Sequence, residues 1–419
     1  MTVLPSGWHT VPLTEVLEHS IGGAWGSVPG QDEVDVRVIR VTELKNHGRL
    51  DSSTAALRSI KKGQLQTRQL RPGDLLLEKS GGGPKTPVGR VGLVRVVEGP
   101  TVCANFMQLM RPNPSLVSAR FLHLFLNHFY MQGGTLGMQT ASTNIRNIKS
   151  SDYFTLPVPV PPLAEQRRIV DLLEEHLSRL DAAEQALERV KLRTNGLLLS
   201  ALQVLMSDAG GRATTLGEVA KWGSGGTPLT GNRAFYEGGT IPWVNSGDLR
   251  DTELTSVPKR ITQQGFEKSA TKWVPTGAVL VAMYGATIGR LAIATEAVTT
   301  NQAVAYAIPG PKLEASFLFW YLRSQRGSLV AAGKGGAQPN ISQTVLKAWP
   351  ILVPSLEVQL NLVEQARELH AAVLRLDGQV QRAIERRVLL RHALLAAGFS
   401  GRLTGRAGDM DVVEEMADV

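Results

Sequence analysis

Apolar residues recur at alternating steps of four and three along a long stretch near the end of the chain. The positions are Leu362, Ala366, Leu369, Val373, Leu376, Val380 and Ala383. Subtracting 193 from each gives Ile169, Leu173, His176, Leu180, Ala183, Leu187 and Val190, of which only His176 is polar. This heptad pattern, with charged residues between the apolar ones, predicts two long helices that pair as a coiled coil. Two amphipathic helices buried separately in two domains would give a similar pattern, and that alternative stays open.

Both predicted helices follow a proline-rich segment. Residues 157–177 read "PVPVPPLAEQRRIVDLLEEHL" and residues 350–370 read "PILVPSLEVQLNLVEQARELH". Proline removes an amide donor and keeps the preceding residue extended, so each segment is predicted to be a stiff polyproline-like or edge-strand connection. Pro162 suits the first turn of a helix, and Glu165 places negative charge near the helix N-terminus.

The two halves of the chain repeat one another. Three pairs of markers are each 196 positions apart, namely Asn105 and Asn301, Phe121 and Phe317, and Asn144 and Asn340. Upstream the offset grows to 200 between "PVGRVGLV" and "TIGRLAIA", as small loop insertions would produce. Each half contains short β-type runs, one amphipathic helix, a glycine-rich turn, the proline-rich segment and a long helix.

The pattern therefore predicts an α+β protein. Two α/β modules are joined by two long antiparallel helices that form a coiled coil, with a pseudo-twofold internal repeat. The predicted divisions are a first module at 1–160, a central helix at 161–207, a second module at 208–353, a distal helix at 354–400 and an acidic tail at 401–419.

Composition adds a preference for an anionic partner. The formal net charge is +8, which favours nucleic acid without establishing it. The single cysteine, Cys103, excludes an internal disulfide framework and suits the reducing cytoplasm. The start of the chain lacks the pattern of a signal peptide, and no apolar run approaches the ~20 residues of a membrane helix. We expect a cytoplasmic protein that makes no membrane contact.

Enzyme motifs are not found. The nearest string to an adenine-methylase box is "PNPS" at 112–115, and Lys334 stands in "AGKGGAQ" rather than in a phosphate-binding loop. Neither an HExxH motif nor a nucleophile elbow is present. We therefore predict no catalytic residue and no metal site. A self-sufficient enzyme of an unfamiliar type stays open as an alternative.

The residues that carry the strongest family signal are "PVPPLAEQRRIV" at 159–170 and "LLRHALLAAGFSGRLTG" at 389–405. Together with the repeated glycine turn, they resemble the specificity subunit of type I restriction-modification systems over nearly the whole chain. Two departures are "PSLEVQ" at 354–359 in place of "PPLAEQ", and Asn195-Gly196, a candidate kink in the central helix.

The resemblance implies a non-catalytic subunit whose two target-recognition domains each read one half of a bipartite, asymmetric double-stranded DNA site. The coiled coil fixes the unread spacer. The implied partners are two methyltransferase subunits, which carry S-adenosylmethionine, and restriction subunits, which use ATP and magnesium when present. This chain itself is expected to hold no cofactor. A structural coiled-coil adaptor that reads no bases is the alternative.

Two matched loops in each module supply the candidate DNA contacts. Lysine and arginine suit phosphates and guanine edges, and amide side chains suit adenine edges. A tight β-turn with solvated cations is the competing interpretation for each of them. Trp25, Trp222, Trp243 and Trp273 are interpreted as core or loop anchors rather than base-stacking platforms. The candidate contacts are Lys79, Lys85, Thr86, Arg90, Gln139, Ser142, Asn144, Tyr284, Thr287, Arg290, Lys334, Gln338 and Asn340.

Overall fold

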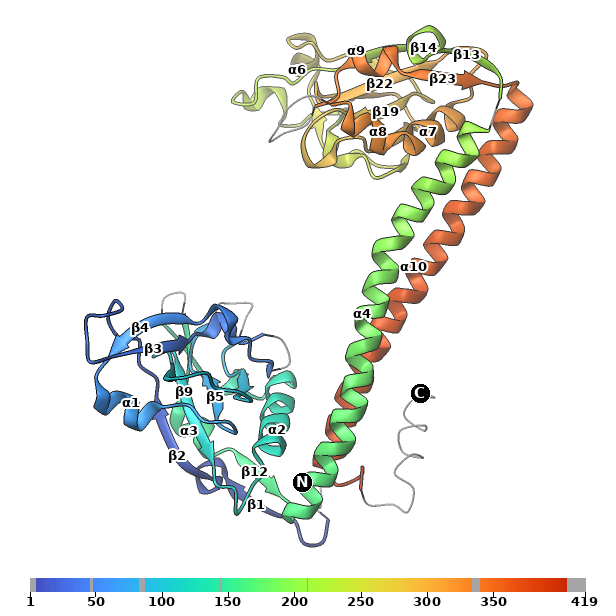
Figure 1. Ribbon diagram of the computed structural model, residues 1–419. Helices are drawn as coiled ribbons and strands as arrows, with labels where there is room; N and C mark the ends of the chain where they lie inside the picture. The colour runs from blue at the N-terminus through green and yellow to red at the C-terminus, as the bar shows by residue number, and fades with distance from the viewer. Residues whose placement is uncertain are drawn as a thin grey trace. The chain divides into compact units, whose positions relative to one another are not determined.

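The chain divides into two compact units, and each unit contains one module and part of both long helices. One unit comprises Met1–Ala186 and Ala383–Val419, and the other is Leu187–Arg382. The computed structural model (Figure 1) describes residues 5–45, 48–82, 87–142, 145–208, 210–333 and 340–404. The mixture of helix and sheet, the internal repeat and the two long helices confirm the predicted fold class. The predicted tail at 401–419 lies almost wholly outside the described residues.

The first module is built mainly on antiparallel sheet. Its main sheet has the strand order β2-β9-β5-β7, and β4-β3-β8, β10-β11-β6 and β1-β12 form smaller sheets. Helix α2 packs on the main sheet and contributes Phe121 and Leu122 to the core. The strands are β1 His9–Pro12, β2 Leu17–Gly22, β3 Val34–Ile39, β4 Ala56–Ile60, β5 Leu75–Glu78, β6 Ser80–Gly82, β7 Val91–Leu93, β8 Thr101–Cys103, β9 Met107–Pro112, β10 Gln139–Ser142, β11 Ile145–Ile148 and β12 Pro157–Val160. The helices are α1 Lys62–Arg68, α2 Ala119–Met131, α3 Ser150–Phe154 and the long α4 Leu163–Ser207.

The second module repeats this plan. Its sheets are β14-β22-β19-β20-β16, β17-β15-β21-β18 and β13-β23, and α7 covers the first of them. The strands are β13 Arg212–Thr215, β14 Ala220–Ser224, β15 Ile241–Val244, β16 Thr252–Leu254, β17 Arg260–Ile261, β18 Trp273–Val274, β19 Val279–Ala282, β20 Leu291–Ala294, β21 Val298–Thr300, β22 Val304–Pro309 and β23 Pro350–Val353. The helices are α5 Leu216–Val219, α6 Gln263–Glu267, α7 Ala315–Ser324, α8 Arg326–Ala331, α9 Gln343–Ala348 and the long α10 Leu356–Phe399.

Backbone pairing corrects one marker of the repeat. In the first module the amide of Ala104 donates to the carbonyl of Ile39, the last residue of β3, at 2.8 Å. In the second module the amide of Asn301 donates in the same way to Val244, the last residue of β15, at 2.9 Å. Asn301 is therefore equivalent to Ala104 and not to Asn105. A one-residue shift between the halves hides this in the sequence.

The proline-rich segments are edge strands. Residues Pro157–Val160 form β12, which pairs antiparallel with β1, and Pro350–Val353 form β23, which pairs antiparallel with β13. Proline is tolerated there because each pair is a two-stranded ladder in which one side of the strand needs no donor. Each ladder leads directly into its long helix, which starts at Leu163 or Leu356.

One buried glutamine fastens each long helix to its module. The amide nitrogen of Gln166 donates to the carbonyls of Leu116 and Pro161 at 3.0 and 2.8 Å, and its oxygen accepts from the amide of Ser118 at 2.7 Å. Gln359 makes the equivalent bonds to Lys312, Pro354 and Glu314 at 2.9, 2.9 and 2.8 Å. Both side chains are fully buried, so the bonds satisfy groups that water cannot reach.

We expect Gln359→Leu to lower the free energy of unfolding by at least ~2 kcal/mol, because it leaves two buried carbonyls and one amide without partners. Chemical denaturation measures the loss. Gln365→Leu, an exposed glutamine on the same helix, is the control and should change stability by less than about 0.5 kcal/mol. Equal losses for the two variants would contradict the role of Gln359.

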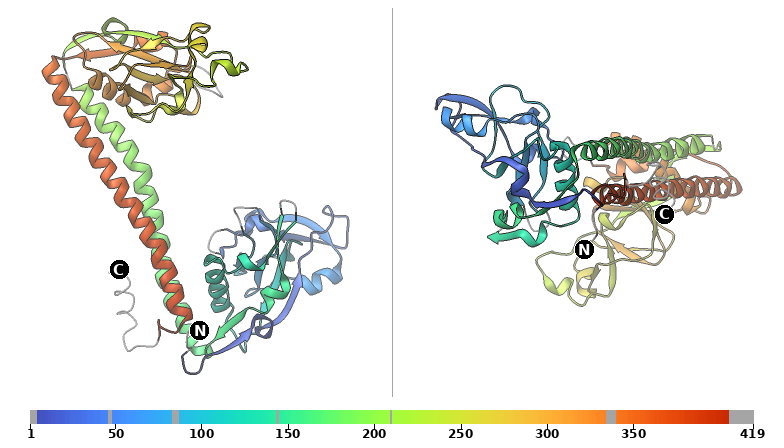
Figure 2. Two further views of the ribbon diagram at one scale, coloured as in Figure 1. Left: turned by 180° about the vertical axis from the view of Figure 1, so that it is seen from behind. Right: turned by 90° about the horizontal axis from the view of Figure 1, so that it is seen from below.

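Within the first unit the two long helices run antiparallel (Figures 1 and 2). Arg387 donates to Glu184 at 2.6 Å and Arg391 donates to Asp181 at 2.6 Å, so rising numbers on α10 meet falling numbers on α4. The two arginine side chains are only 7% and 8% exposed. A buried arginine that has lost its carboxylate partner strongly destabilises the folded state. The two ion pairs therefore favour this one alignment of α10 against α4.

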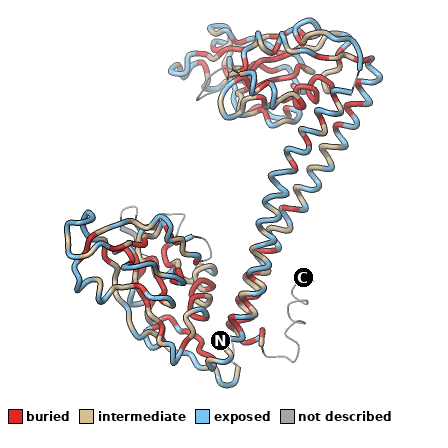
Figure 3. Tube along the Cα trace, viewed as in Figure 1, coloured by how far each residue is buried: buried red, intermediate tan, exposed pale blue. Residues whose placement is uncertain are grey.

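Buried residues recur along both long helices (Figure 3). They depart in part from the predicted heptad positions. Ile169, Leu173, Leu362, Ala366 and Val380 are buried, and His176, Leu180, Leu187, Leu369, Val373 and Ala383 are half-buried. Val190 and Leu376 are each 38% exposed, and Ala183 is also exposed. On α4 the stripe continues instead through Thr194, Leu198, Leu202 and Met206, at steps of four. A straight helix has 3.6 residues per turn, so a strict heptad drifts off the contact face.

No described helix has an apolar stretch long enough to cross a membrane.

Candidate nucleic-acid interface

Lys79 and Gln139, two of the predicted contacts of the first module, are brought together by β11. The carbonyl of Lys79 accepts from the amide of Ile148 at 2.8 Å, and Ile148 pairs with Gln139 across the β10–β11 ladder. Lys79 is half-buried. The Gln139 nitrogen donates to the carbonyl of Val88 at 3.4 Å, and its oxygen is buried without a partner. The Gln139 oxygen is therefore a hydrogen-bond acceptor that no described residue uses.

Arg90 is held inside the module instead of facing outward. Its Nε and Nη2 donate to the Glu78 carboxylate at 2.8 and 2.9 Å, and its Nη1 donates to the carbonyl of Leu44 at 2.8 Å. The hydrogen bonds to Glu78 raise the pKa of Arg90 although burial lowers it. The guanidinium therefore joins β5 to the neighbouring loop, which is a positioning role for the residues around it.

Arg290 follows the second glycine turn and differs from Arg90 in its surroundings. The backbone amide of Ala282 donates to the Arg290 carbonyl at 2.9 Å, and the amide of Glu78 donates to the Arg90 carbonyl at 2.8 Å. Ala282 is therefore the equivalent of Glu78. Position 282 is alanine, so Arg290 has no carboxylate there. The Arg290 side chain is exposed. The same sequence signal thus marks a buried ion pair in one module and an exposed cation in the other.

The loop of residues 284–290 is fixed from behind by Arg326. Its Nε donates to the carbonyl of Gly289 at 2.8 Å, and its Nη1 donates to Asp251 at 2.9 Å. Asp251 adopts a left-handed backbone conformation, with φ of 62°, and accepts from the amide of Leu291 at 3.0 Å. On the outer side Tyr284 is 40% exposed and forms a bridge with Asn340. Thr287 is half-buried, and its hydroxyl donates to the Tyr284 carbonyl at 3.4 Å.

Most of the remaining predicted contacts lie outside the described residues. Lys85, Thr86, Asn144, Lys334 and Gln338 lie outside the described residues, and Ser142 is placed only as the last residue of β10.

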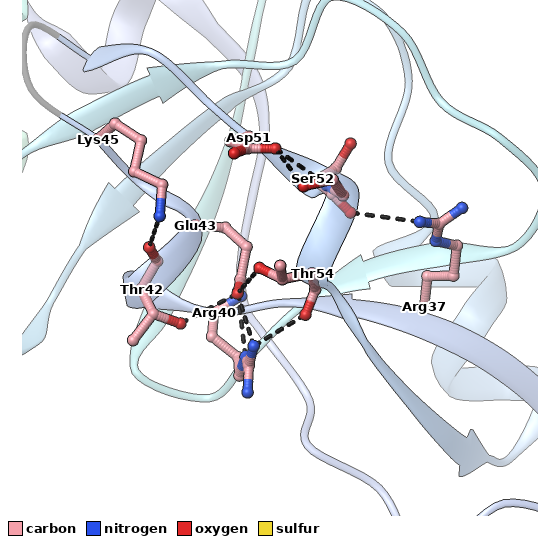
Figure 4. A network of polar contacts seen from close by, with 9 residues as sticks. Arg37, Arg40, Thr42, Glu43, Lys45, Asp51, Ser52 and Thr54 are labelled. Carbon is pink, nitrogen blue, oxygen red and sulfur yellow. Dashed lines mark hydrogen bonds and ion pairs between the residues drawn. The ribbon is translucent and has the colours of Figure 1, made fainter. Parts of the chain in front are cut away.

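Glu43 is the centre of a polar network in the first module (Figure 4). The carboxylate is fully buried. It accepts from the amide of Arg40 at 2.6 Å, from the Arg40 guanidinium at 2.6 and 3.1 Å, and from the hydroxyls of Thr42 and Thr54 at 3.0 Å. Arg40 also donates to the carbonyl of Thr54 at 2.8 Å. The network closes the turn that follows β3.

Burial opposes the ionisation of Glu43, but the hydrogen bonds from Arg40, Thr54 and Thr42 outweigh it and hold the pKa of Glu43 below its usual value. A carboxylate with a lowered pKa in the folded state adds stability above its unfolded pKa of about 4.3, and that stability is lost as the pH falls through the folded pKa.

We therefore expect Glu43→Gln to destabilise the first unit by ~1.5–3 kcal/mol at pH 7, the range for hydrogen bonds to a charged group. The difference from the wild type should shrink as the pH falls from the unfolded pKa of about 4.3 through the lowered folded pKa of Glu43. Urea denaturation at pH 7 and pH 3.5 measures this. Glu98→Gln is the control, because Glu98 pairs with Arg37 while 79% exposed, and should change little. A loss that is independent of pH would contradict the charged network.

The equivalent turn in the second module opens into a groove instead. Asn245 occupies the place of Arg40, since its amide donates to Asp248 at 2.8 Å as that of Arg40 does to Glu43. The groove has a volume of about 610 Å³ and is lined by Asn245, Asn301, Tyr236, Trp243, Lys259 and Arg260, together with two threonines. Sequence reasoning missed this site. The available signals were Asn301, noted only as a repeat marker, and Trp243, interpreted as an anchor.

Among the described residues no group of histidine, cysteine, aspartate and glutamate could hold a metal ion.

Comparison with protein families gives one match that covers both modules. The model described as "Type I restriction modification DNA specificity domain" matches residues 5–192 and again residues 213–381. Among curated proteins, the StySPI specificity subunit of Salmonella potsdam is 23% identical over 441 residues, covering 98% of this chain and 92% of the relative. The EcoR124I/EcoR124II specificity subunit of Escherichia coli is 25% identical over 251 residues, covering 57% of this chain and 62% of the relative.

Two solved structures have the same fold. One chain, from work on complex assembly and conformational transition of the type I R-M system, superposes with a TM-score of 0.76 at 21% identity, covering 96% of this chain and 100% of that chain. The HsdS subunit of Thermoanaerobacter tengcongensis superposes with a TM-score of 0.59 at 22% identity, covering 96% of this chain and 98% of that subunit.

Proposed function

Because this chain belongs to the type I restriction-modification DNA specificity family, we propose that it selects the DNA sequence on which such a complex acts. Each module reads one half of a bipartite, asymmetric site in double-stranded DNA, and the paired helices set the unread spacer. The observation that carries this proposal is the family match to both modules, at residues 5–192 and 213–381.

The candidate reading loops of the two modules support asymmetric reading. Tyr284, Thr287, Arg290 and Asn340 form the candidate reading loop of the second module, and Lys79 and Gln139 belong to that of the first. The two loops differ in charge placement, because Arg290 is exposed while Arg90 is paired with Glu78. Different reading surfaces suit two different half-sites.

Exposed apolar side chains on the long helices support docking of methyltransferase subunits. Leu192, Leu197 and Val204 on α4 are 80%, 66% and 62% exposed. On α10, Leu374 and Leu389 are 57% and 69% exposed. Apolar side chains that neither helix buries are suited to a protein partner. In this proposal two methyltransferase subunits bind S-adenosylmethionine, restriction subunits bring ATP and magnesium, and this chain supplies neither cofactor nor catalytic residue.

The test is methylome sequencing of a host that expresses this chain with its methyltransferase partner. The expected result is methylated adenine in two short sequence blocks around a spacer of fixed length. Exchange of residues 208–353 for those of a relative should then change one block and leave the other intact. A structural adaptor that reads no bases predicts that the exchange leaves the methylated sequence unchanged, and that result would overturn the proposal.

A further inference from the structure

The groove of the second module has the chemical character of a site for an anionic, planar ligand. Two cationic residues, Lys259 and Arg260, are exposed at its rim, and none of the described residues that line it is acidic. Tyr236 and Trp243 form an aromatic wall, with ring centroids 5.9 Å apart. The polar tips of both rings are already bonded within the module, Tyr236 to the carbonyl of Pro228 and Trp243 to that of Gly226. Trp243 is only 5% exposed and Tyr236 is half-buried, so it is mainly the Tyr236 ring that offers apolar surface to a ligand.

Two amide side chains in the lining keep unused hydrogen-bonding capacity. Asn301 donates to the Oδ1 of Asn245 at 3.1 Å, and its own oxygen accepts from the amide of Ala303 at 3.1 Å. Asn245 donates to the carbonyl of Trp243 at 3.3 Å. Each amide nitrogen has a second hydrogen, and each oxygen has a second lone pair. The pair is held in a fixed orientation and can still both donate and accept.

The groove adjoins the predicted reading loop. The amide of Met283 donates to the carbonyl of Ala303 at 2.8 Å, and Met283 directly precedes Tyr284. Asn301, Ala303 and Tyr284 thus lie just beyond the same end of the β19–β22 ladder, where Ala282 pairs with Val304. A DNA strand on the loop of residues 284–290 would have the groove as its neighbour.

The equivalent turn of the first module carries different side chains. Arg40 stands where Asn245 does and is tied to Glu43, and Ala104 stands where Asn301 does. The two positions that carry amides in one module therefore carry a paired guanidinium and a methyl group in the other.

We propose that this groove is a second base-reading site of the second module. It receives one DNA strand, with a phosphate on Lys259 and Arg260 and a base edge on the amides of Asn245 and Asn301. This inference rests on the proposed function and deepens it, because it assigns the groove to one half-site only. Amide side chains that donate and accept together are suited to adenine, and cations at the rim to phosphate.

The experiment uses the complete complex with its methyltransferase subunits, a fluorescent duplex carrying the site found by methylome sequencing, and duplexes with single base changes. Asn245→Ala should weaken binding of the cognate duplex by roughly 5- to 150-fold, the equivalent of a lost base contact, and relax the methylated sequence in one block alone. Lys259→Ala should weaken all duplexes alike and reduce the salt dependence, with the methylated sequence unchanged.

Lys312→Ala is the matched control, because Lys312 is exposed beyond the other end of β22 from Asn301. It should leave affinity and sequence unchanged. Equal thermal denaturation midpoints for all variants show that each is folded. If the wild type methylates a two-block site and the groove variants match it in affinity and methylated sequence, the groove assignment alone is overturned. A wild type without a two-block site would overturn the proposed function, and the groove assignment with it.

Discussion

Adding seven residues to α4 after Ala186 and seven to α10 after Arg382 should lengthen the unread spacer of the methylated site. Seven residues keep a coiled-coil seam in phase, and at ~1.5 Å per residue they add about 10 Å to each helix. That length corresponds to about three base pairs at ~3.4 Å each. Both insertions fall where the chain passes between its two units. The Arg387–Glu184 and Arg391–Asp181 pairs remain together within the first unit.

The spacer is measured by methylome sequencing, and both sequence blocks should stay as in the wild type. Insertion into α4 alone is the control. It places seven residues opposite no partner and should strongly reduce methylation of every site. A double insertion that methylates the original site, with the original spacer, would show that the helices do not set the distance.

Gly225→Ala should unfold or strongly destabilise the second module. An added methyl carbon would lie 1.6 Å from the carbonyl oxygen of Thr300 and 2.4 Å from its carbon, and both are backbone atoms that cannot turn aside. The segment that directly follows β14 would have to move away from Thr300, the last residue of β21. We expect a loss of at least ~3 kcal/mol, above the usual range for overpacking, and a fall of the unfolding midpoint by roughly 6–12 °C.

Thermal denaturation with limited proteolysis measures the loss and locates it. Gly247→Ala is the control, since nothing lies within 4 Å of an added methyl there. Gly23→Ala is the counterpart in the first module, where the methyl carbon would lie 2.1 Å from the carbonyl oxygen of Ala104. Its damage should fall on the first module instead. A Gly225→Ala protein with the wild-type midpoint would contradict the close approach of Gly225 to Thr300.

Local signals predicted the long helices and their connections well. Proline and the heptad pattern act over a few residues, so the edge strands Pro157–Val160 and Pro350–Val353 and the helices that follow them were visible in the sequence. The role of the glutamine in "PPLAEQ" was not, although it stands in the family signature. Its partners, Leu116 and Ser118, are distant in the sequence and are brought to it only by folding.

The candidate site shows the same division. Arg90 and Arg290 both follow a glycine turn and were given the same role, but their partners are set by position 78 or 282 on a neighbouring strand. The seam departs from the heptad at Val190 and Leu376 because the buried face also depends on which partner side chains each helix meets. The groove is lined by residues between 227 and 301. They are too far apart in the sequence for helix or strand periodicity to predict that they lie together.

The sequence by itself determined the duplication, the α+β class, the two long helices and the family resemblance. Periodicity, proline placement and repeated strings are properties of neighbouring residues, and they survive without a fold. Only the tertiary structure decided which cations are paired, which residues of the two halves are equivalent, and where a groove opens. Those features depend on strand pairing and side-chain contacts between distant residues, and a shift of one residue, as at Ala104 and Asn301, moves them.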